Sequence, residues 1–510
     1  MMIVLFDSAV EPGKRVPTNL PSNQPTLFFP LVFSRKISQK TERDKRTGYC
    51  VMKAHLFSLL VLLFSYGQSK PDIHINYRFI IAVPTEYNES NIGRAFLMEN
   101  TQAEPGFKAA LSIEPVNGNY SCSLEVFLGD VKVWSSGHRS KFYLTEKCVL
   151  ELTSDGDLQL KGPKERVGWR TGTSGQGVER LQILRTGNLV LLDALNRIKW
   201  QSFNFPTDVM LRGQRLNVAT HLTSFPSHSS VLYSFEILRS KIALYLNSGK
   251  RNYSYWEFKP SKNRNISFIE LGPKGLELFN DKHKKIAQII SSQTIQPLRF
   301  LALGNKTGNL GLYFYSPQDR RFGAAFQALN NTCDLPQACR PYGICTISNS
   351  CSCLQVLTKG DQCNAGIPEG FCGKDQVEML ELGGLTNVLK AIPEKVNSSK
   401  EACADLCLAD CTCVAALYSS GEEDKNLGKC FIYGMVMGVK QIGEEAGGLT
   451  YMVKVPRGTK VSQGKSQVKK WVFLVVGVAD GLIILVVLAG IGYYLIQRRR
   501  KNLTTTRNNS

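Results

Sequence analysis

The chain has 510 residues, enough for three or four domains, and a net charge of +20 at pH 7. Most of the positive excess lies before residue 70 and after residue 453, and the long segment between them is only weakly basic. Basic segments at both ends are typical of a chain that meets a membrane surface, and they argue against nucleic-acid binding.

The first 69 residues divide into an extension and a leader. Residues 1–51 are polar and contain proline, and we predict a non-structural N-terminal extension that precedes a natural start at Met52. A genuine extension, with the leader inside the chain, is the alternative. Residues 52–69 have a polar start, an apolar stretch too short to cross a bilayer and small residues at the end. They predict a signal peptide, so we expect the rest of the chain to be exported.

Residues 70–216 contain short apolar stretches separated by Gly, Asp, Asn and Pro, as in a domain of β-strands. Two segments repeat one pattern of alternating residues, a turn and a second strand: LELTSDGDLQL at 150–160 and LQILRTGNLVLLD at 181–193. Repeated hairpins of this kind predict a β-prism or a barrel. Cys122 and Cys148 are the only cysteines in this region, so we expect them to form a disulfide bond.

The remaining exported cysteines form two clusters. The first cluster lies in a segment too short to bury a sufficient core, so cross-links must hold it. In the second cluster Cys403 and Cys407 are four residues apart and would share one face of a helix. The exported part has an even number of cysteines and no CxxC pair, which favours disulfide bonds over zinc. The clusters are Cys333, Cys339, Cys345, Cys351, Cys353 and Cys363, then Cys372, Cys403, Cys407, Cys411, Cys413 and Cys430.

The C-terminal part predicts a stalk, a membrane helix and a tail. Residues 456–470 are polar and basic, as in a solvated stalk. Residues 471–496 are apolar and long enough to cross a bilayer, and basic residues follow at once. Positive residues stay in the cytosol, so we expect a type I protein of the plasma membrane with residues 497–510 as its cytosolic tail.

Asp480 lies near the centre of the expected membrane helix, between Gly477 and Gly481. A charged residue at that depth is costly and often functional, and glycines four apart permit close helix approach. One hypothesis is that this face contacts a partner helix. The alternative is that Asp480 is protonated or tolerated and that the glycines are incidental.

Sequons for N-linked glycosylation are spread over the exported part. One sequon arises easily by chance, but seven predict that several carry a glycan. Their asparagines are Asn88, Asn119, Asn252, Asn265, Asn305, Asn330 and Asn397.

Several segments resemble, in order, the plant S-domain family of receptor kinases and S-locus glycoproteins. The stretch WQSFNFPTDVMLRGQRL at 200–216 resembles the signature that closes their bulb-type (G-type) lectin domain, and both repeats resemble its strands. VKVWSSGHR at 131–139 falls where those proteins have a strand with Val and Trp. Three further motifs match the S-locus glycoprotein region, the EGF-like module and the PAN/apple domain. They are LRFLALGNKTGNLGLYFY at 298–315, CDLPQACRPYGICTISNSCSCL at 333–354 and ACADLCLADCTCVAALY at 402–418.

The resemblance, together with the apolar run at 471–496, predicts a mainly β chain with one transmembrane helix. For the PAN domain it implies the bonds Cys403–Cys430 and Cys407–Cys413, which leaves Cys372 to pair with Cys411. From the residues alone, six cysteines allow 15 pairings. The expected domains are a bulb-lectin-like β-prism at 70–216, an S-locus glycoprotein-like region at 217–330, a small disulfide-rich EGF-like module at 331–365 and an α+β PAN domain at 372–455.

Bulb-type lectins hold mannose with the pattern Q-x-D-x-N-x-V-x-Y. The second repeat keeps only Asn188 and Val190 of this pattern, and the first keeps only Asp155. A site without most of its hydrogen-bonding groups loses most of its specificity. We therefore expect these residues to be turn and strand positions of a lectin-like scaffold.

The sequence offers no catalytic site. None of its six histidines lies in a Ser or Cys nucleophile signature, and no G-x-S-x-G, H-E-x-x-H or phosphate-binding glycine loop occurs. We expect neither enzymatic activity nor a cofactor or metal, and glycosidase activity of the exported part is the enzymatic alternative.

These features predict a receptor-like protein that binds an extracellular carbohydrate or protein ligand. The S-domain receptor kinases carry a kinase domain, and this chain departs from them because a tail of 14 residues follows the membrane segment. We therefore expect a kinase-bearing co-receptor as partner, or a homodimer. The alternative is an adhesion glycoprotein that binds wall carbohydrate without signalling.

Overall fold

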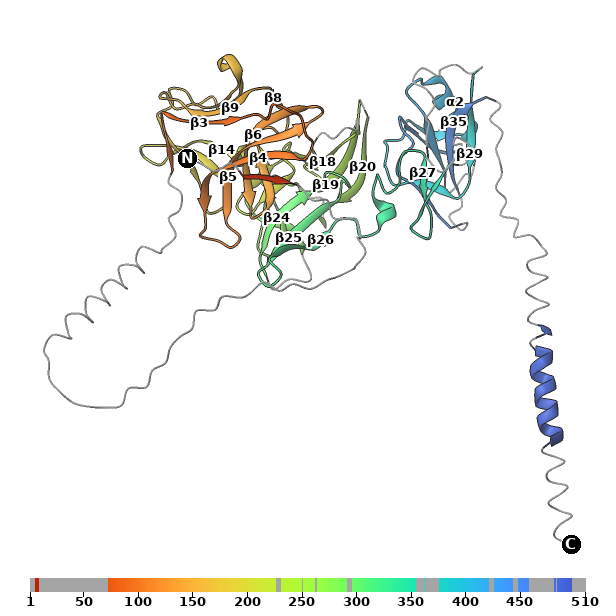
Figure 1. Ribbon diagram of the computed structural model, residues 1–510. Helices are drawn as coiled ribbons and strands as arrows, with labels where there is room; N and C mark the ends of the chain where they lie inside the picture. Colours follow the sequence, from red (N-terminus) through yellow and green to blue (C-terminus); the bar gives the residue numbers. More distant parts are fainter. Residues whose placement is uncertain are drawn as a thin grey trace, which may run out of the picture.

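A computed structural model describes most of the chain between residues 72 and 457 and short segments outside it. The described part is mainly β, as the sequence predicts, and lies in two neighbouring bodies (Figure 1). The described residues are 5–8, 72–225, 231–249, 251–261, 264–290, 296–354, 363, 376–421, 426–443, 448–457, 481–482 and 484–497.

Three antiparallel sheets surround one core and form the first prism. Their strand orders are β1-β4-β5-β6-β7 with β8 beside β6, then β11-β10-β9-β3, then β14-β13-β12-β2. The strands are β1 (Leu5–Ser8), β2 (Ile73–His74), β3 (Tyr77–Ala82), β4 (Asn91–Asn100), β5 (Phe107–Val116), β6 (Asn119–Leu128), β7 (Val131–Ser135), β8 (Phe142–Leu144), β9 (Lys147–Leu152), β10 (Leu158–Lys161), β11 (Val167–Arg170), β12 (Val178–Ile183), β13 (Leu189–Asp193) and β14 (Ile198–Gln201), with 3-10 turns η1 (Pro163–Glu165) and η2 (Ser202–Asn204).

Strand β1 belongs to the N-terminal extension that the sequence predicts to be non-structural. Its four residues pair antiparallel with β4, so β1 is the edge strand of that sheet. The remainder of residues 1–51 and the predicted signal peptide lie outside the described residues.

The two sequence repeats form equivalent hairpins in two of the sheets, β9–β10 and β12–β13. Each repeat continues into a further strand, as the pairs β10–β11 and β13–β14, and the pair β6–β7 is a third copy of these that the sequence does not indicate. In each copy the N–H of an inward-facing leucine donates to a hydroxyl that lies two residues after a tryptophan. These hydrogen bonds are Leu124–Ser136 at 2.9 Å, Leu158–Thr171 at 3.1 Å and Leu189–Ser202 at 3.0 Å, and the tryptophans are Trp134, Trp169 and Trp200. The same bond in all three sheets gives the prism its internal threefold repetition.

Strands from residue 209 onward build a second prism of three four-stranded sheets. The sheet orders are β15-β24-β25-β26, β16-β21-β22-β23 and β17-β18-β19-β20. The strands are β15 (Val209–Leu211), β16 (Arg215–Asn217), β17 (His221–Thr223), β18 (Val231–Ile237), β19 (Ile242–Ser248), β20 (Arg251–Phe258), β21 (Phe268–Leu271), β22 (Gly275–Phe279), β23 (Lys285–Ile290), β24 (Leu298–Leu303), β25 (Leu310–Ser316) and β26 (Arg321–Gln327).

The second prism begins earlier than the boundary at residue 216 that the sequence predicts. Strands β15 and β16 lie before or across that boundary, yet β15 pairs with β24 and β16 pairs with β21. The successive short strands β15, β16 and β17 each enter a different sheet. The partners of β15 and β16 therefore come from much later in the chain. A boundary set by such long-range pairing has no local signal in the sequence.

The segment predicted to be EGF-like, residues 331–365, shares a sheet with the predicted PAN segment, residues 372–455, whereas the sequence predicts two separate modules. Its strands β27 (Gly343–Cys345) and β28 (Cys351–Cys353) pair with each other. Strand β27 also pairs in parallel with β34 (Val439–Gln441), which pairs with β30 (Leu385–Asn387). The 3-10 turn η4 (Thr332–Asp334) precedes them, and the disulfide bonds are Cys333–Cys345, Cys339–Cys351 and Cys353–Cys363.

The PAN segment is α+β, with helix α2 (Lys400–Ala409) against a five-stranded sheet. The Ser399 hydroxyl accepts a hydrogen bond from the Ala402 N–H and caps the helix at 3.2 Å. The bonds Cys403–Cys430 and Cys407–Cys413 are both present, as the family resemblance implies. Cys411 is also disulfide-bonded, and Cys372 lies outside the described residues. The sheet order is β29 (Val377–Leu382), β35 (Leu449–Pro456), β32 (Ala415–Ser420), β33 (Gly428–Tyr433) and β31 (Lys395–Ser398).

The second prism and the PAN segment share one hydrophobic core. Tyr253 on β20 stacks on Tyr433 with ring centroids 5.6 Å apart, and its hydroxyl accepts a hydrogen bond from the Gly434 N–H at 2.9 Å. Arg251 and Asp410 add an ion pair at 2.6 Å. These contacts join the two bodies of Figure 1.

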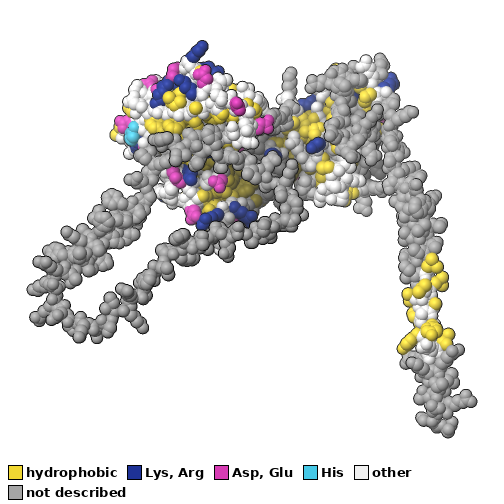
Figure 2. Space-filling model, viewed as in Figure 1, with side chains coloured by type: hydrophobic (Ala, Val, Ile, Leu, Met, Phe, Trp, Pro, Cys, Tyr) yellow, Lys and Arg dark blue, Asp and Glu magenta, His cyan; other side chains and the backbone are white. Residues whose placement is uncertain are grey.

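The described residues include part of the predicted membrane helix. Residues 484–497 are helical, and Figure 2 shows hydrophobic side chains exposed along them. Within the described ranges, no helix has the length and apolarity that a bilayer crossing requires. Residues 471–480, with Gly477 and Asp480, lie outside these ranges.

Candidate functional site

The three residues that remain of the mannose pattern do not form a site in the first prism. Asp155 lies in the turn between β9 and β10, whereas Asn188 and Val190 belong to the β12–β13 hairpin. Val190 has no exposed surface, and Asn188 is only 5% exposed. The lectin pattern needs these side chains at the surface, and here two of the three are covered.

The Asn188 amide is already used inside the domain. Its Nδ2 donates to the Gln201 side chain at 2.7 Å. Its Oδ1 accepts from the Ser202 hydroxyl and from the Phe203 N–H, both at 3.2 Å. Asn188 therefore holds η2 in place.

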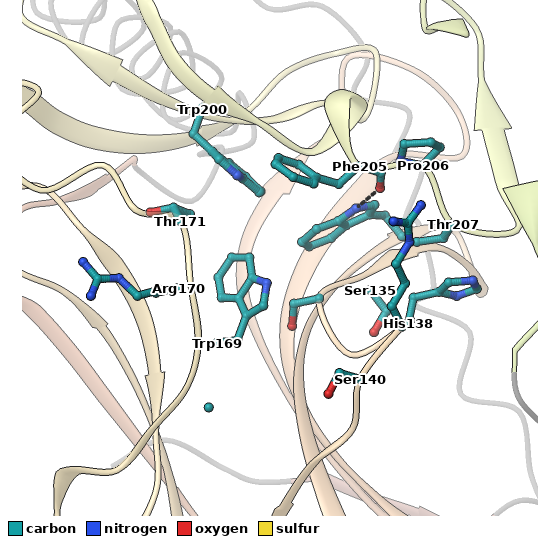
Figure 3. Close-up of a pocket in the computed structure, with 14 residues that line it drawn as sticks. Ser135, His138, Ser140, Trp169, Arg170, Thr171, Trp200, Phe205, Pro206 and Thr207 are labelled. Carbon is teal, nitrogen blue, oxygen red and sulfur yellow. Dashed lines mark hydrogen bonds between the residues drawn. The ribbon is translucent and has the colours of Figure 1, made fainter. Parts of the chain in front are cut away.

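A cavity of about 360 Å³ opens where the three sheets of the first prism converge (Figure 3). Its walls come from the ends of β7, β11 and β14 and from the loops that follow them. The lining residues are Trp134, Ser135, Ser136, His138, Arg139, Ser140, Gly168, Trp169, Arg170, Thr171, Trp200, Phe205, Pro206 and Thr207.

The aromatic wall of this cavity contains one tryptophan from each sheet. The ring centroids of Trp134, Trp169 and Trp200 are 5.8–6.3 Å apart, and each pair meets edge to face. Phe205 stacks on Trp200 at 5.7 Å, and its carbonyl accepts a hydrogen bond from Trp134 Nε1 at 2.9 Å. The Phe205 side chain is 53% exposed, so it offers an open aromatic surface beside the buried cluster.

Polar and charged groups complete the cavity. Arg139 and Ser140 are exposed in the loop after β7. Arg170 pairs with the buried Asp157 at 2.9 Å. Burial alone would raise the pKa of the Asp157 carboxyl. Hydrogen bonds from Gln159, Thr173 and Thr171 and the charge of Arg170 outweigh burial and hold that pKa below its ordinary value.

His138 is almost fully buried at one side of the cavity. Its Nε2 lies 2.8 Å from the Thr223 carbonyl oxygen, so this nitrogen carries the proton and donates it. Its Nδ1 is buried and has no hydrogen-bond partner among the described residues. Burial lowers the pKa of His138 to about 4, although the Thr223 hydrogen bond acts in the opposite direction. The imidazole is therefore neutral near pH 6.

The buried neutral imidazole of His138 predicts an acid-sensitive domain. Between pH 6.5 and pH 4 the unfolded chain binds a proton that the folded chain does not, so acidification favours unfolding. We expect the free energy of unfolding to fall by about 2–3 kcal/mol from pH 7 to pH 4.5 on account of this group. Chemical denaturation at both pH values measures the change. The His138→Gln variant should lose this part of the pH dependence, and an unchanged dependence would contradict the assignment.

The cavity combines the two kinds of contact that a sugar ring needs. Exposed aromatic carbon can pack on the C–H face of the ring, and hydroxyl and guanidinium groups can bond to its hydroxyls. No group of His, Cys, Asp or Glu in the described ranges could hold a metal ion. The sequence does not by itself indicate this cavity. The one signal for it in the sequence is the W-x-S/T spacing that recurs in all three sheets.

A protein-family comparison finds the D-mannose binding lectin domain in residues 132–229. This range begins inside β7, includes the other two tryptophans and ends beyond β17. It therefore contains every residue that lines the cavity of Figure 3.

Curated relatives match a longer part of the chain. A G-type lectin S-receptor-like serine/threonine-protein kinase of Arabidopsis thaliana is 22% identical, with 74% of this chain and 47% of the relative covered. A PAN domain-containing protein of Arabidopsis thaliana is 24% identical, with 69% of this chain and 73% of the relative covered. An EP1-like glycoprotein of Arabidopsis thaliana is 25% identical, with 65% and 79% covered. The chain thus spans about half the length of the receptor-like kinase.

Among solved structures, the fetuin-binding two-domain lectin of Scilla campanulata is 16% identical and covers 48% of this chain and 91% of its own. Its TM-score of 0.17 is too low to establish a shared arrangement.

Proposed function

We propose that this chain, which is a relative of the plant S-domain receptor family and carries its bulb-type lectin domain, is a cell-surface receptor-like protein that binds an extracellular carbohydrate. The observation that carries the proposal is the aromatic cavity of Figure 3, within the matched lectin range. The ligand meets Phe205 and the half-buried Trp169, while Arg139, Ser140 and Arg170 bind its hydroxyls.

The disulfide bonds support an extracellular location. Bonds of this density form and persist in oxidising compartments. All seven asparagines of the predicted glycosylation sites are exposed, as glycan attachment requires. We propose that residues 52–69 direct export and that residues 471–496 anchor the chain once in the plasma membrane.

Phe205 offers a direct test of the cavity. Because its ring is half exposed, Phe205→Ala should remove a stacking surface without a large loss of stability. We expect the dissociation constant of a neutral glycan found by array screening to rise by roughly tenfold, which corresponds to about 1.4 kcal/mol. Isothermal titration of the purified chain measures it.

The matched control is Leu195→Ala, because Leu195 is 70% exposed and lies in the β13–β14 turn of the same prism, outside the cavity. The control should bind as the parent chain does. Equal binding by the Phe205 variant, with its unfolding midpoint unchanged, would place the sugar elsewhere.

A finer part of the proposal concerns signalling. The kinase relatives support a receptor context, and the 510 residues contain none of the kinase motifs. We propose that the signal passes to a kinase-bearing partner in the membrane. An adhesion glycoprotein that binds wall carbohydrate is the alternative. Proximity labelling from the C-terminus distinguishes them, since a signalling role requires a recurrent kinase neighbour and adhesion does not.

A further inference from the structure

A second cavity lies between the two prisms. Its volume is about 550 Å³, and residues of both prisms line it. Arg185 comes from the β12–β13 turn of the first prism, Arg212 from the turn after β15, and Arg299 from β24. Three arginines from separate parts of the chain thus line one cavity.

The three arginines are held differently. Arg299 is anchored, because its Nη1 donates to the Glu104 carbonyl at 2.8 Å and its Nη2 donates to the Pro105 carbonyl at 3.2 Å. Burial and the nearby charge of Arg212 both lower the pKa of Arg299. Arg185 and Arg212 are exposed, and neither has an acidic partner within the described ranges.

One acidic side chain lines this cavity, and it is already paired. Glu270 Oε1 accepts from Arg215 Nε and lies 2.7 Å from Arg215 Nη2 as well. The arginines of the cavity therefore share no counter-ion from the described part of the chain. Unpaired like charges that face one hollow favour an anion there.

Shape and chemistry narrow the choice of anion. A guanidinium group presents a planar fork of donors that fits a carboxylate with two parallel hydrogen bonds. The cavity also has apolar surface, since the exposed Pro273 and Pro297 are among the residues that line it. Planar donors beside apolar surface suit a ring that carries a carboxylate.

We propose that this cavity binds the carboxylate of an acidic sugar, a uronic acid residue of a polysaccharide. The choice of a sugar rests on the proposed carbohydrate function, whereas the requirement for a negative charge rests on the arginines alone. The ectodomain then has two subsites, one aromatic and neutral, the other cationic and placed at the junction of the prisms.

The test uses the purified full chain and an oligomer of galacturonic acid in isothermal titration. Its fully methyl-esterified form and inorganic phosphate are the comparison ligands. The variant Arg185→Gln with Arg212→Gln removes two charges and leaves the anchored Arg299 intact. The matched control is Arg239→Gln, because Arg239 is exposed in the β18–β19 turn of the second prism, outside the cavity.

We expect the acidic oligomer to bind the parent chain and the control equally, and the double variant at least tenfold more weakly. The ester should not compete, and added salt should weaken binding. Equal binding of acid and ester, or of parent and double variant, would overturn the proposal. The proposal would also be overturned if inorganic phosphate bound as tightly as the acidic oligomer and displaced it, because the cavity would then be a general anion site. Phe205→Ala should weaken binding of the neutral glycan, whereas the double arginine variant should leave that binding unchanged. This pair of results distinguishes the arginine cavity from the aromatic cavity.

Discussion

The Trp200→Ala variant is expected to lower the free energy of unfolding of the first prism by about 3–5 kcal/mol. The side chain is 7% exposed and meets the rings of Trp134, Trp169 and Phe205. It therefore joins its own sheet to both others, and truncation leaves a void that all three sheets border. Denaturant titration followed by circular dichroism measures the loss.

The exposed Leu195 again serves as the control, because Leu195→Ala should change stability by less than about 0.5 kcal/mol. Hydrogen exchange adds a spatial readout: amides of β7, β11 and β14 should exchange faster in the Trp200 variant, while those of the PAN sheet stay protected. A loss below about 1 kcal/mol would mean that the tryptophan cluster is not the core of this prism.

Loss of the Cys403–Cys430 bond is expected to cost the PAN segment about 2–5 kcal/mol. Both cysteines have no exposed surface, and the bond ties helix α2 to strand β33. The double variant Cys403→Ala with Cys430→Ala should show a lower unfolding midpoint and a reduced yield of folded protein. Thermal unfolding and the amount of folded protein recovered on purification measure these effects.

The second bond of the helix provides an internal comparison. Cys403–Cys430 closes a loop with sequence separation 27, whereas Cys407–Cys413 has separation 6. Loop-closure entropy alone makes the longer loop more stabilising by about 1 kcal/mol. The double variant Cys407→Ala with Cys413→Ala should therefore lose less stability. The reverse order would show that packing around the sulfurs, rather than chain entropy, dominates.

Tight coupling between the second prism and the PAN segment gives this loss a wider consequence. The Tyr253–Tyr433 stack places the end of β33 directly against β20. A loss of stability in the PAN segment should therefore also loosen the second prism, because both contribute side chains to that core.

The candidate sites show where sequence analysis reached its limit. Asn188 and Val190 were identified from a known pattern, and the residues missing from that pattern led to the prediction of a scaffold role. The aromatic cavity was not identified, because Trp134 and Phe205 are 71 residues apart and His138 and Thr223 are 85 apart. The arginine cavity likewise draws on two separate turns and on strand β24.

The amino-acid sequence by itself determined the β character of the chain, the two visible hairpin repeats and the cysteine-rich modules. The alternation of apolar and polar residues, the turn residues and the cysteine spacing each involve only a few neighbouring residues. Such local patterns can therefore be recognised in the sequence. Only the tertiary structure decided where the second prism begins, that the EGF-like and PAN segments share a sheet, and which side chains meet in each cavity. Those outcomes depend on strands and turns that pair across long stretches of chain, and such contacts leave no local pattern.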